Sequence, residues 1–528
     1  MDIEAVNHRL ATCTLIAAVC AFGASSPAVV IGKKPNILII LADDLGYGDV
    51  QCYNPERGRI PTPNIDRLAA QGMRFTDAHS SSGVCSPSRY ALLTGRYHWR
   101  TGRAGIVPVF GPPMIAANRL TLPALFRRHG YHTTAIGKWH LGWDWPIPAS
   151  KMELFHGMKP KDEEAPSDAQ RAVWREAFSQ SIPGGPTTRG FDNYFGTDVP
   201  NWPPYCFIEN DRALGVPSVF LPPRLVGYNQ ASLHGPALAD WKLESILPKL
   251  GDRACAYLAE AATKPQPFFL YLPLTSPHTP LAVAEEWKGK SKLNSYADFV
   301  MQTDAVVGRV LEALDQAGAT RNTLVLFTSD NGCAPYIGAV ELEKLGHFPS
   351  GPLRGFKSDV WEGGHRIPFI VRWPGVVKPG SVCGQLVHQA DLLATGAAIL
   401  DAKLPANAAE DSFSFLPLLH GHDQPVREHA VSQSFQGLLA VRKGPWKLIF
   451  GPGSGGWSKG GDDQPAQLYN LADDLAERKN LFTKKPELVA ELTELMTRIV
   501  TQGRSTPGPP QTNDAPMKWR ITTKFTGD

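Results

Sequence analysis

Residues 35–42 read PNILIILA, an apolar run in which hydrophobic and polar positions do not alternate. This pattern is typical of a strand that is buried on both faces, as in a parallel sheet. Similar runs recur at residues 131–136, 267–274, 323–329 and 367–372. Helical patterns lie between these runs, so we predict an α/β fold with a large, mainly parallel sheet flanked by helices.

Two of the intervening segments carry clear helix signals. Thr121 can cap a helix over residues 122–129, and Gly130 can end it. The second segment precedes Gly318 and places apolar residues at i, i+3, i+4 and i+7 spacing: Val307, Val310, Leu311 and Leu314. Both segments are expected to form helices that pack on the sheet.

Composition narrows the class of protein. The 528 residues are 43% hydrophobic and 20% charged, which is ordinary for a globular protein and excludes a disordered or fibrous chain. The 53 Lys and Arg exceed the 50 Asp and Glu by only three charges, so nothing indicates a nucleic-acid partner. A balance so near neutral still allows an anionic small substrate, because a few local cations are enough to bind one.

The beginning of the chain is typical of an export signal. Residues 10–22 are a short apolar run followed by small residues. We therefore predict a signal peptide over residues 1–26, and a secreted or periplasmic protein with no membrane span after cleavage. A buried N-terminal helix, or a start placed too far upstream, is the alternative.

Beyond about residue 425 the sequence changes character. Short strand-like pieces at 438–442 and 446–450 precede a helical pattern at 486–500. We therefore predict a catalytic domain over residues 35–425, followed by a C-terminal α+β subdomain and tail over residues 426–528.

Hard-oxygen side chains follow two of the predicted strands. Asp43 and Asp44 come directly after the first strand, and Asp330 and Asn331 follow the run at 323–329. Because carboxyl ends of parallel strands meet at one edge of a sheet, these side chains should lie together. Carboxylates this close repel one another unless a cation lies among them, and oxygen ligands favour calcium or magnesium over zinc. The alternative is that each pair is an ordinary turn.

Cationic and imidazole side chains follow the other strands. Lys138 and His140 come after the run at 131–136, His278 comes after the run at 267–274, and Lys357 precedes a turn-rich segment. A site with a dication, several cations and two imidazoles suits a doubly charged oxyanion such as a sulfate or phosphate ester. Taken singly, each residue could equally be a surface or core residue.

Residues 85–96 read CSPSRYALLTGR. Pro87 is favourable in the first turn of a helix, which would place Cys85 at a helix N-terminus, where backbone amides attract an anion. Arg89 would follow on the same face, and its planar fork suits a tetrahedral oxyanion. A buried structural cysteine before a helix is the alternative.

This stretch resembles the signature of the type I, formylglycine-dependent sulfatase family, C-x-P-S-R-x-x-x-L-T-G-R, and matches it without a gap. Further motifs that resemble the family occur in order: DDLGYGD from Asp43, TPNID from Thr62, GKWHLG from Gly137, PHTP from Pro277, SDNG from Ser329, GFK from Gly355 and LYNL from Leu468. The chain is most similar to the arylsulfatase A and galactosamine-6-sulfatase branch.

The resemblance implies an alkaline-phosphatase-like fold with a smaller C-terminal antiparallel sheet and a helix. It also implies a sulfuric ester hydrolase in which Cys85 is oxidised to formylglycine by a formylglycine-generating enzyme during maturation. One calcium ion is implied, and its ligands are Asp43, Asp44, Asp330, Asn331 and the formylglycine at position 85. The implied substrate is a sulfated small molecule or saccharide.

The same resemblance implies these catalytic residues: Cys85, Arg89, Lys138, His140, His278 and Lys357. Arg89 holds the formylglycine hydrate, and Lys138 and Lys357 bind sulfate oxygens. His278 protonates the leaving alcohol, either alone or together with Lys357. His140 is the base that expels sulfate and restores the aldehyde.

Substrate contacts are expected from Lys138, His278 and Lys357, and from two further residues. Trp202 lies in the Pro-rich stretch DVPNWPPYCF and suits a sugar ring, although a buried tryptophan is equally ordinary. His365 occupies a position that is often aliphatic in the family, and we expect it to mark a subfamily or to touch substrate.

Two rival classes remain open at this point. One is a phosphatase or phosphodiesterase of the same superfamily, which usually has a Ser or Thr nucleophile and more histidines around paired zinc ions. Cys85 and the Asp/Asn set argue against it. The other is a non-enzymatic binder, in which an unmodified Cys85 lies in a pocket that holds sulfate without turnover.

Overall fold

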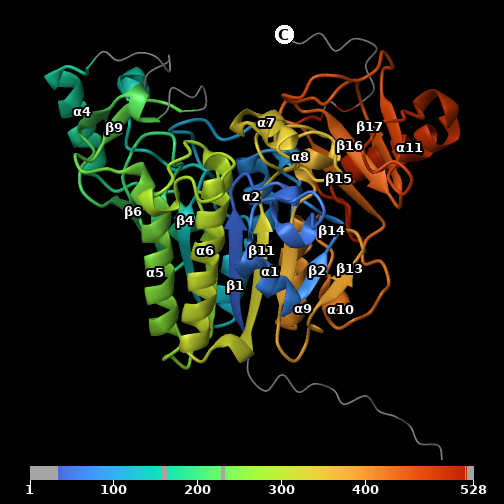
Figure 1. The fold of residues 1–528 in the computed structure, drawn as a ribbon, viewed down its shortest axis with the longest axis horizontal. Coiled ribbons are helices and arrows are strands. Elements are labelled where there is room, and N and C mark those ends of the chain that lie inside the picture. Colours follow the sequence, from blue (N-terminus) through green and yellow to red (C-terminus); the bar gives the residue numbers. More distant parts are fainter. Residues whose placement is uncertain (1–33, 156–164, 227–231, 518, 520–528) are drawn as a thin grey trace, which may run out of the picture. The chain divides into compact units, whose positions relative to one another are not determined.

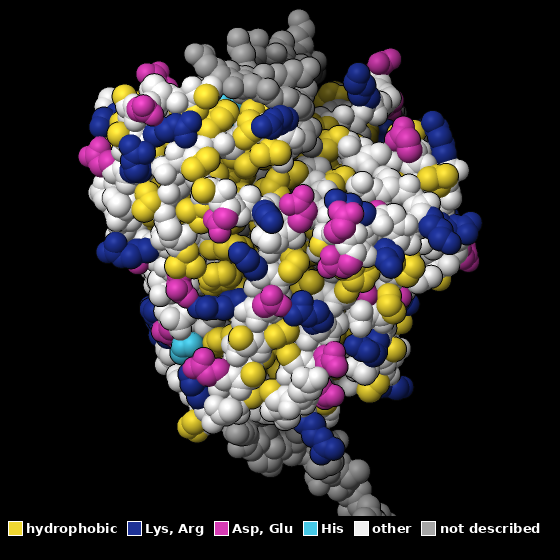
Figure 2. Space-filling model, turned by 60° about the vertical axis from the view of Figure 1, so that its left-hand side comes forward, with side chains coloured by type: hydrophobic (Ala, Val, Ile, Leu, Met, Phe, Trp, Pro, Cys, Tyr) yellow, Lys and Arg dark blue, Asp and Glu magenta, His cyan; other side chains and the backbone are white. Residues whose placement is uncertain are grey.

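The computed structural model describes residues 34–155, 165–226, 232–517 and 519 (Figure 1). The predicted signal peptide, residues 1–26, lies outside the described residues. Within the described part of the chain, no helix has both the length and the apolar character needed to cross a membrane. Figure 2 shows one face of the molecule, on which Lys/Arg and Asp/Glu side chains are interspersed.

A mixed sheet of ten strands forms the centre of the structure. In spatial order the strands are β13 (Ser381–Cys383), β2 (Met73–Phe75), β12 (Phe369–Arg372), β11 (Thr323–Ser329), β1 (Asn36–Ala42), β10 (Phe268–Pro273), β4 (His132–Lys138), β5 (Asn193–Thr197), β6 (Ile208–Glu209) and β7 (Arg212–Ala213). The five strands from β11 to β5 run parallel, whereas β12 and β6 pair antiparallel with their neighbours. The predicted α/β fold is confirmed, with antiparallel pairing added towards both margins.

The central strand β1 shows why its sequence does not alternate. Ile37, Ile39 and Leu41 pack into the hydrophobic layer on one face of the sheet. Leu38 and Ile40 pack into the layer on the other face. Both faces are covered, so every position from Ile37 to Ala42 is apolar.

Helices build these two layers. The first layer is formed by α2 (Cys85–Thr94), α3 (Leu122–Arg128), α9 (Leu392–Ile399) and α10 (Leu416–Leu419). The second is formed by α1 (Pro63–Ala70), α5 (Ile246–Ala261) and α6 (Ser295–Gln316), of which Figure 1 shows α5 and α6 side by side.

Both predicted helices are confirmed. In α3 the Thr121 hydroxyl accepts a hydrogen bond from the N–H of Ala124, as expected of an N-cap. In α6 the predicted apolar stripe is buried.

The other elements in the described part of the chain are short or peripheral. They are β3 (Ala78–His79), β8 (Val219–Leu221), β9 (Gly235–Ala237), β14 (Val387–His388), α4 (Asp168–Phe178), α7 (Ala339–Lys344) and α8 (Glu362–His365). Of these, α4 lies far from α8 along the molecule in Figure 1.

The C-terminal region contains a separate antiparallel sheet. Its strands are β15 (His429–Gln433), β16 (Leu439–Lys443), β17 (Trp446–Ile449) and β18 (Gln467–Asn470), followed by the helix α11 (Pro486–Thr501). Val441 and Leu448 of this sheet pack with Leu492 and Met496 of α11. The predicted sheet-plus-helix unit is confirmed, while the boundary at residue 425 stays a prediction.

Candidate active site

Four polar side chains meet where β1 and β11 end. The two strands are parallel and in register up to Ala42 and Ser329, so the residues that follow them lie at one edge of the sheet. The N–H of Asp44 donates to Asp330 Oδ1 at 3.1 Å. Asn331 Nδ2 donates to Asp44 Oδ1 at 2.8 Å. The structure therefore brings together the four side chains whose clustering the sequence predicts.

Each of the three carboxylates in this group has a buried cation beside it. The pairs are Lys138 Nζ–Asp43 Oδ2 at 2.6 Å, Lys357 Nζ–Asp44 Oδ2 at 2.6 Å and Arg89 Nη2–Asp330 Oδ2 at 2.8 Å. Burial alone would raise the pKa of Asp43, but Lys138 and the other nearby cations hold that pKa well below its usual range. Asp43 is therefore ionised, which a metal ligand requires.

Unused oxygens indicate that the cluster fits a divalent cation. Asp43 Oδ1 and Asn331 Oδ1 are buried and accept no hydrogen bond from the described residues. Burial and the neighbouring Asp43 charge raise the pKa of Asp330 to about 7, although Arg89 lowers it. A hard cation would relieve this crowding and satisfy both free oxygens.

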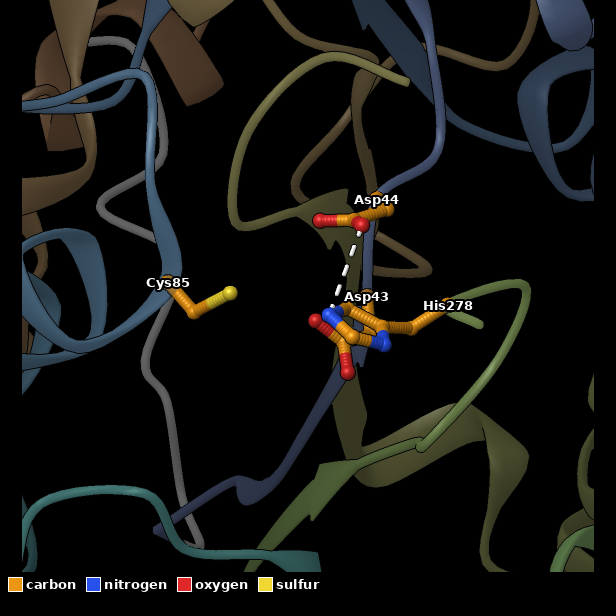
Figure 3. A group of neighbouring side chains, drawn as sticks. All are labelled: Asp43, Asp44, Cys85 and His278. Carbon is orange, nitrogen blue, oxygen red and sulfur yellow. Dashed lines mark ion pairs between the residues drawn. The ribbon is translucent and has the colours of Figure 1, made fainter. Parts of the chain in front are cut away.

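Cys85 and His278 complete the same cluster. One ligand atom each from Asp43, Asp44, Cys85 and His278 lie within 4.8 Å of one another. Figure 3 shows the Cys85 sulfur pointing towards the two carboxylates and the imidazole, and the ion pair between His278 and Asp44. Carboxylate and amide oxygens still dominate the predicted ligand set, which favours calcium or magnesium.

Cys85 is the first residue of α2, as its sequence context predicts. It is only 2% exposed. Burial raises the pKa of the Cys85 thiol to about 12, although Lys138 and Lys357 lower it. The unmodified residue is therefore a neutral thiol, and it is not activated as a thiolate nucleophile.

The two predicted catalytic histidines differ in which ring nitrogen is free. His140 Nε2 lies 3.2 Å from the carbonyl oxygen of Val107, which can only accept, so Nε2 carries the proton and Nδ1 is left as an acceptor. Burial and then Lys138 lower the pKa of His140 well below its usual value. His140 is therefore a neutral imidazole with a free lone pair on Nδ1.

His278 has the opposite arrangement. Its Nδ1 donates to the carbonyl oxygen of Thr279, and its Nε2 lies 3.6 Å from Asp44 Oδ2. Burial and then Lys357 lower the pKa of His278 to about 4, although Asp44 raises it. The nitrogen that faces the carboxylate cluster is thus the one that must gain a proton before His278 can act as an acid.

Three residues at or next to this cluster have a strained backbone. Asp44, His140 and Ser358 have φ values of 65°, 52° and 80°, in the left-handed region that non-glycine residues rarely adopt. The N–H of His140 donates to the backbone oxygen of Asp198 at 3.1 Å and lies 3.2 Å from Asp198 Oδ1. Asp198, in the stretch expected to wall the pocket, therefore holds the strained backbone of a predicted catalytic residue.

A cavity of about 520 Å³ opens above these groups. At its base lie Cys85, His140, His278 and Lys357. Trp202 lines it as predicted, with its ring 5.3 Å from that of His140. Three further aromatic residues that sequence reasoning missed also line it: Tyr336, Phe435 and Trp457. The sequence contains a signal for one of them, because Trp457 is the single aromatic residue in the glycine-rich stretch 451–461.

His365 is not among the residues that line this cavity, in contrast to the expectation that it touches substrate. It is buried in a separate cluster, where its Nδ1 lies 3.1 Å from His79 Nδ1 and its Nε2 lies 2.9 Å from the oxygen of Val360. Lys447 of the C-terminal sheet lies 3.2 Å from the same Nε2. His365 therefore contacts the C-terminal sheet through Lys447.

The fold and this site define a hydrolase that acts on esters of a tetrahedral oxyanion. Buried cations can bind the oxyanion, hard oxygens can bind a metal ion, and imidazoles can transfer protons. The hard oxygens and both imidazoles follow the carboxyl ends of sheet strands, where open α/β sheets bind ligands.

The chain belongs to the sulfatase family, whose model matches residues 35–402. It is therefore a sulfuric ester hydrolase. N-acetylgalactosamine-6-O-sulfatase from Bacteroides thetaiotaomicron is 35% identical over 511 residues, which covers 89% of this chain and 94% of that protein. Arylsulfatase A from Homo sapiens is 31% identical over 504 residues, which covers 89% of each chain. The predicted family and branch are confirmed.

A solved structure supports the same assignment. A Bacteroides thetaiotaomicron protein described under "Metabolism of multiple glycosaminoglycans" superposes with a TM-score of 0.76 at 32% sequence identity. The match covers 88% of this chain and 99% of the other.

Proposed function

We propose that this sulfatase hydrolyses sulfate monoesters of saccharides, using a formylglycine made from Cys85 and one calcium ion. The observation that carries the proposal is the position of Cys85, buried at the start of α2 and aimed at a cluster of hard-oxygen ligands. Support for a saccharide substrate comes from the similarity to an N-acetylgalactosamine-6-O-sulfatase and from the aromatic residues that line the cavity.

The chain has residues that suit both the formylglycine and the calcium ion. Asp43, Asp44, Asp330 and Asn331, with residue 85, would hold the calcium ion. A formylglycine hydrate supplies a geminal diol as nucleophile, while calcium supplies positive charge that stabilises the sulfate oxygens. A thiol that stays protonated cannot do the same work, which is why modification of Cys85 is part of the proposal.

Lys138 and Lys357 bind the sulfate oxygens. Each ammonium group now lies against one oxygen of a carboxylate, Asp43 or Asp44. Burial disfavours a charged lysine, but Asp44 raises the pKa of Lys357 well above its usual value, so its proton is retained. The Lys357 ammonium group can therefore face the substrate as a full positive charge.

The imidazoles divide the proton transfers between them. His140 accepts a proton at Nδ1, the nitrogen that the described residues leave without a hydrogen-bond partner. His278 delivers a proton from Nε2 to the leaving alcohol, with Lys357 beside it as a second donor. Arg89 is fixed by its two bonds to Asp330, at 3.0 Å and 2.8 Å, and faces residue 85 with a fixed charge.

The maturation and location of the chain belong to the same proposal. A formylglycine-generating enzyme modifies Cys85, the signal peptide of residues 1–26 directs export, and the mature protein is secreted or periplasmic. Residues 35–425 form the catalytic domain, and residues 426–528 form the C-terminal subdomain and tail.

The direct test is a comparison of two esters of one sugar. Purified protein is incubated with N-acetylgalactosamine 6-sulfate and, separately, with the matching 6-phosphate, and released sulfate and phosphate are measured by ion chromatography. Sulfate release with little phosphate release is expected. Faster release of phosphate would contradict the proposal and favour the phosphatase class.

Removing the metal ion is expected to lower sulfate release strongly, because three buried carboxylates then lie close together without it. The protein is treated exhaustively with a chelator, and metal content and activity are measured before and after calcium is returned. One calcium per chain should return together with activity. Full activity in verified metal-free protein, or recovery with zinc alone, would show that the calcium assignment is wrong.

A further inference from the structure

Asp44, a proposed calcium ligand, has a backbone that needs support from its surroundings. Its φ of 65° lies in the left-handed region, which a non-glycine residue keeps only where other contacts hold it there. The N–H of Asp44 donates to Asp330 Oδ1 at 3.1 Å, within the ligand cluster. Its carbonyl oxygen lies 3.1 Å from the hydroxyl of Tyr296, which comes from α6, outside that cluster.

Tyr296 links Asp44 to the far end of the same loop. Its hydroxyl donates to Asp49 Oδ2 at 2.5 Å, and this oxygen also accepts the N–H of Gly46 at 2.8 Å. A phenol has one proton to donate, so that proton lies between the Asp49 carboxylate and the Asp44 carbonyl oxygen. Tyr296 therefore ties both ends of the loop 44–49 to a long helix.

The other carboxylate oxygen of Asp49 is held by His347. His347 Nδ1 accepts a hydrogen bond from the N–H of Arg59 at 3.0 Å, and Nε2 lies 2.8 Å from Asp49 Oδ1. Because a backbone N–H can only donate, Nδ1 is the acceptor and Nε2 carries the proton that is donated to Asp49. Asp49, Tyr296 and His347 are each 0% exposed, and we call them the supporting triad.

The loop 44–49 is also packed closely against the segment that His347 begins. The N–H of Gly48 donates to the oxygen of Pro349 at 2.7 Å. A Cβ atom at Gly46 would lie 2.3 Å from the Pro349 oxygen, and one at Gly48 would lie 2.2 Å from the Phe348 oxygen. Only glycine fits at either position, so the close approach of two backbones explains both glycines of the DDLGYGD motif.

The segment that begins at His347 continues to Lys357, the cation that pairs with Asp44. Lys357 Nζ lies 2.6 Å from Asp44 Oδ2. Between the two ends of this segment, the Ser350 hydroxyl donates to the oxygen of Gly355 at 2.8 Å. The hydrogen bond of His347 to the loop 44–49 therefore fixes the start of the segment whose end supplies the ammonium group.

We propose that Asp49, Tyr296 and His347 are positioning residues for the calcium ion, which hold the Asp44 carboxylate in place as a ligand and are not ligands themselves. This rests on the calcium-dependent function proposed above and adds three residues to which the sequence assigns no role. The backbone conformation of Asp44 sets the direction of its Cβ, and so the place of its carboxylate. A ligand held in advance spares the free energy of reorienting it, and such supporting contacts commonly change metal affinity by about 10- to 100-fold.

The test measures the calcium affinity of metal-stripped, matured protein by isothermal titration calorimetry, which requires no turnover. Tyr296→Phe is expected to weaken calcium binding about tenfold, because the ring stays packed while the hydroxyl is lost. The matched control is Tyr131→Phe, which removes a buried hydroxyl that donates to the oxygen of Pro35 at 2.8 Å, at the opposite edge of the sheet. The control should bind calcium as wild type does.

Two variants of His347 test the other side of the supporting triad. His347→Ala should also weaken calcium binding about tenfold, whereas His347→Gln should restore part of the affinity, because its amide can donate to Asp49. Thermal unfolding without calcium confirms that each variant is folded. At saturating calcium, kcat for sulfate release should return to within about twofold of wild type, since the residues act through the ion and not on the substrate.

The outcomes separate this inference from the proposed function. If folded Tyr296→Phe and His347→Ala bind calcium as tightly as wild type, or if Tyr131→Phe weakens binding equally, the supporting triad does not position the ion. If saturating calcium leaves kcat of the variants low, a role through calcium is wrong. If wild type releases sulfate without binding calcium, the calcium assignment fails and this inference fails with it. If wild type binds calcium but releases no sulfate, the proposed substrate is wrong, and the affinities of the variants still decide the inference.

Discussion

Replacing Cys85 with serine is expected to abolish steady sulfate release, with a loss in kcat of roughly 10³-fold or more. Serine occupies nearly the same space at the start of α2, so the carboxylates and cations around it should remain in place. A serine that has accepted the sulfuryl group has no second hydroxyl whose proton could drive expulsion of sulfate by C–O cleavage, and a second attack at sulfur would be needed.

Mass spectrometry of the peptide that contains residue 85 checks the reason for this loss. Replacing CH₂SH by CHO makes the peptide about 18 Da lighter by atom counting. The matched control is Cys255→Ser, a half-buried free cysteine on α5, which should keep wild-type activity. A fully active preparation whose residue 85 is entirely unmodified thiol would rule out the formylglycine proposal.

His140→Ala is expected to lower steady turnover by about 10²- to 10⁴-fold, because the variant lacks the base proposed for sulfate expulsion. In the proposed mechanism the first half of the reaction does not need His140 Nδ1. The alcohol product should therefore appear in a burst of about one per enzyme, while sulfate release stalls. Rapid-quench measurement of alcohol and sulfate in the same samples distinguishes the two halves.

His278→Ala should behave differently, because this imidazole assists departure of the alcohol. Its loss should reduce turnover most for sugar sulfates, whose alcohols are poor leaving groups, and least for activated aryl sulfates, which need little protonation. His420→Ala, an exposed histidine outside the site, serves as the control. A burst in the His278 variant and none in the His140 variant would reverse the two roles while leaving the sulfatase assignment intact.

The strands and their carboxyl ends were open to prediction because each depends on local sequence. A strand covered on both faces has an apolar centre, and β11 (Thr323–Ser329), with Leu324–Phe327 at its centre, has the bounds that its run predicts. Asp43, Asp44, Asp330 and Asn331 then meet because parallel neighbours end at one edge. No long-range information was needed beyond the pairing of two strands.

The positions of Trp457 and His365 could not be predicted in the same way. Trp457 lies near Lys357 because the loop that carries it, in the C-terminal sheet, is hydrogen-bonded to Ser358. His365 is not among the residues that line the cavity, and it packs beside Lys447, which is distant from it in sequence. Contacts of this kind depend on how two separate sheets pack. The hydrophobic periodicity of one segment does not predict that packing.

The hold of Asp198 on His140 is a similar case. The sequence places Asp198 in a stretch expected to wall the pocket, but it gives no sign that His140 adopts a left-handed backbone. That conformation persists because the Asp198 carbonyl and carboxylate oxygens lie beside its N–H.

The near-complete burial of Cys85 sets an order of events during synthesis. Once α2 has formed, the sulfur lies beneath the cavity and is closed to another protein's catalytic groups, because Cys85 is only 2% exposed. An enzyme that modifies this residue must therefore act while the segment 85–96 is still extended, before folding is complete. Under the formylglycine proposal, chain that folds before modification is inactive, so the active fraction of a preparation depends on the relative rates of modification and folding.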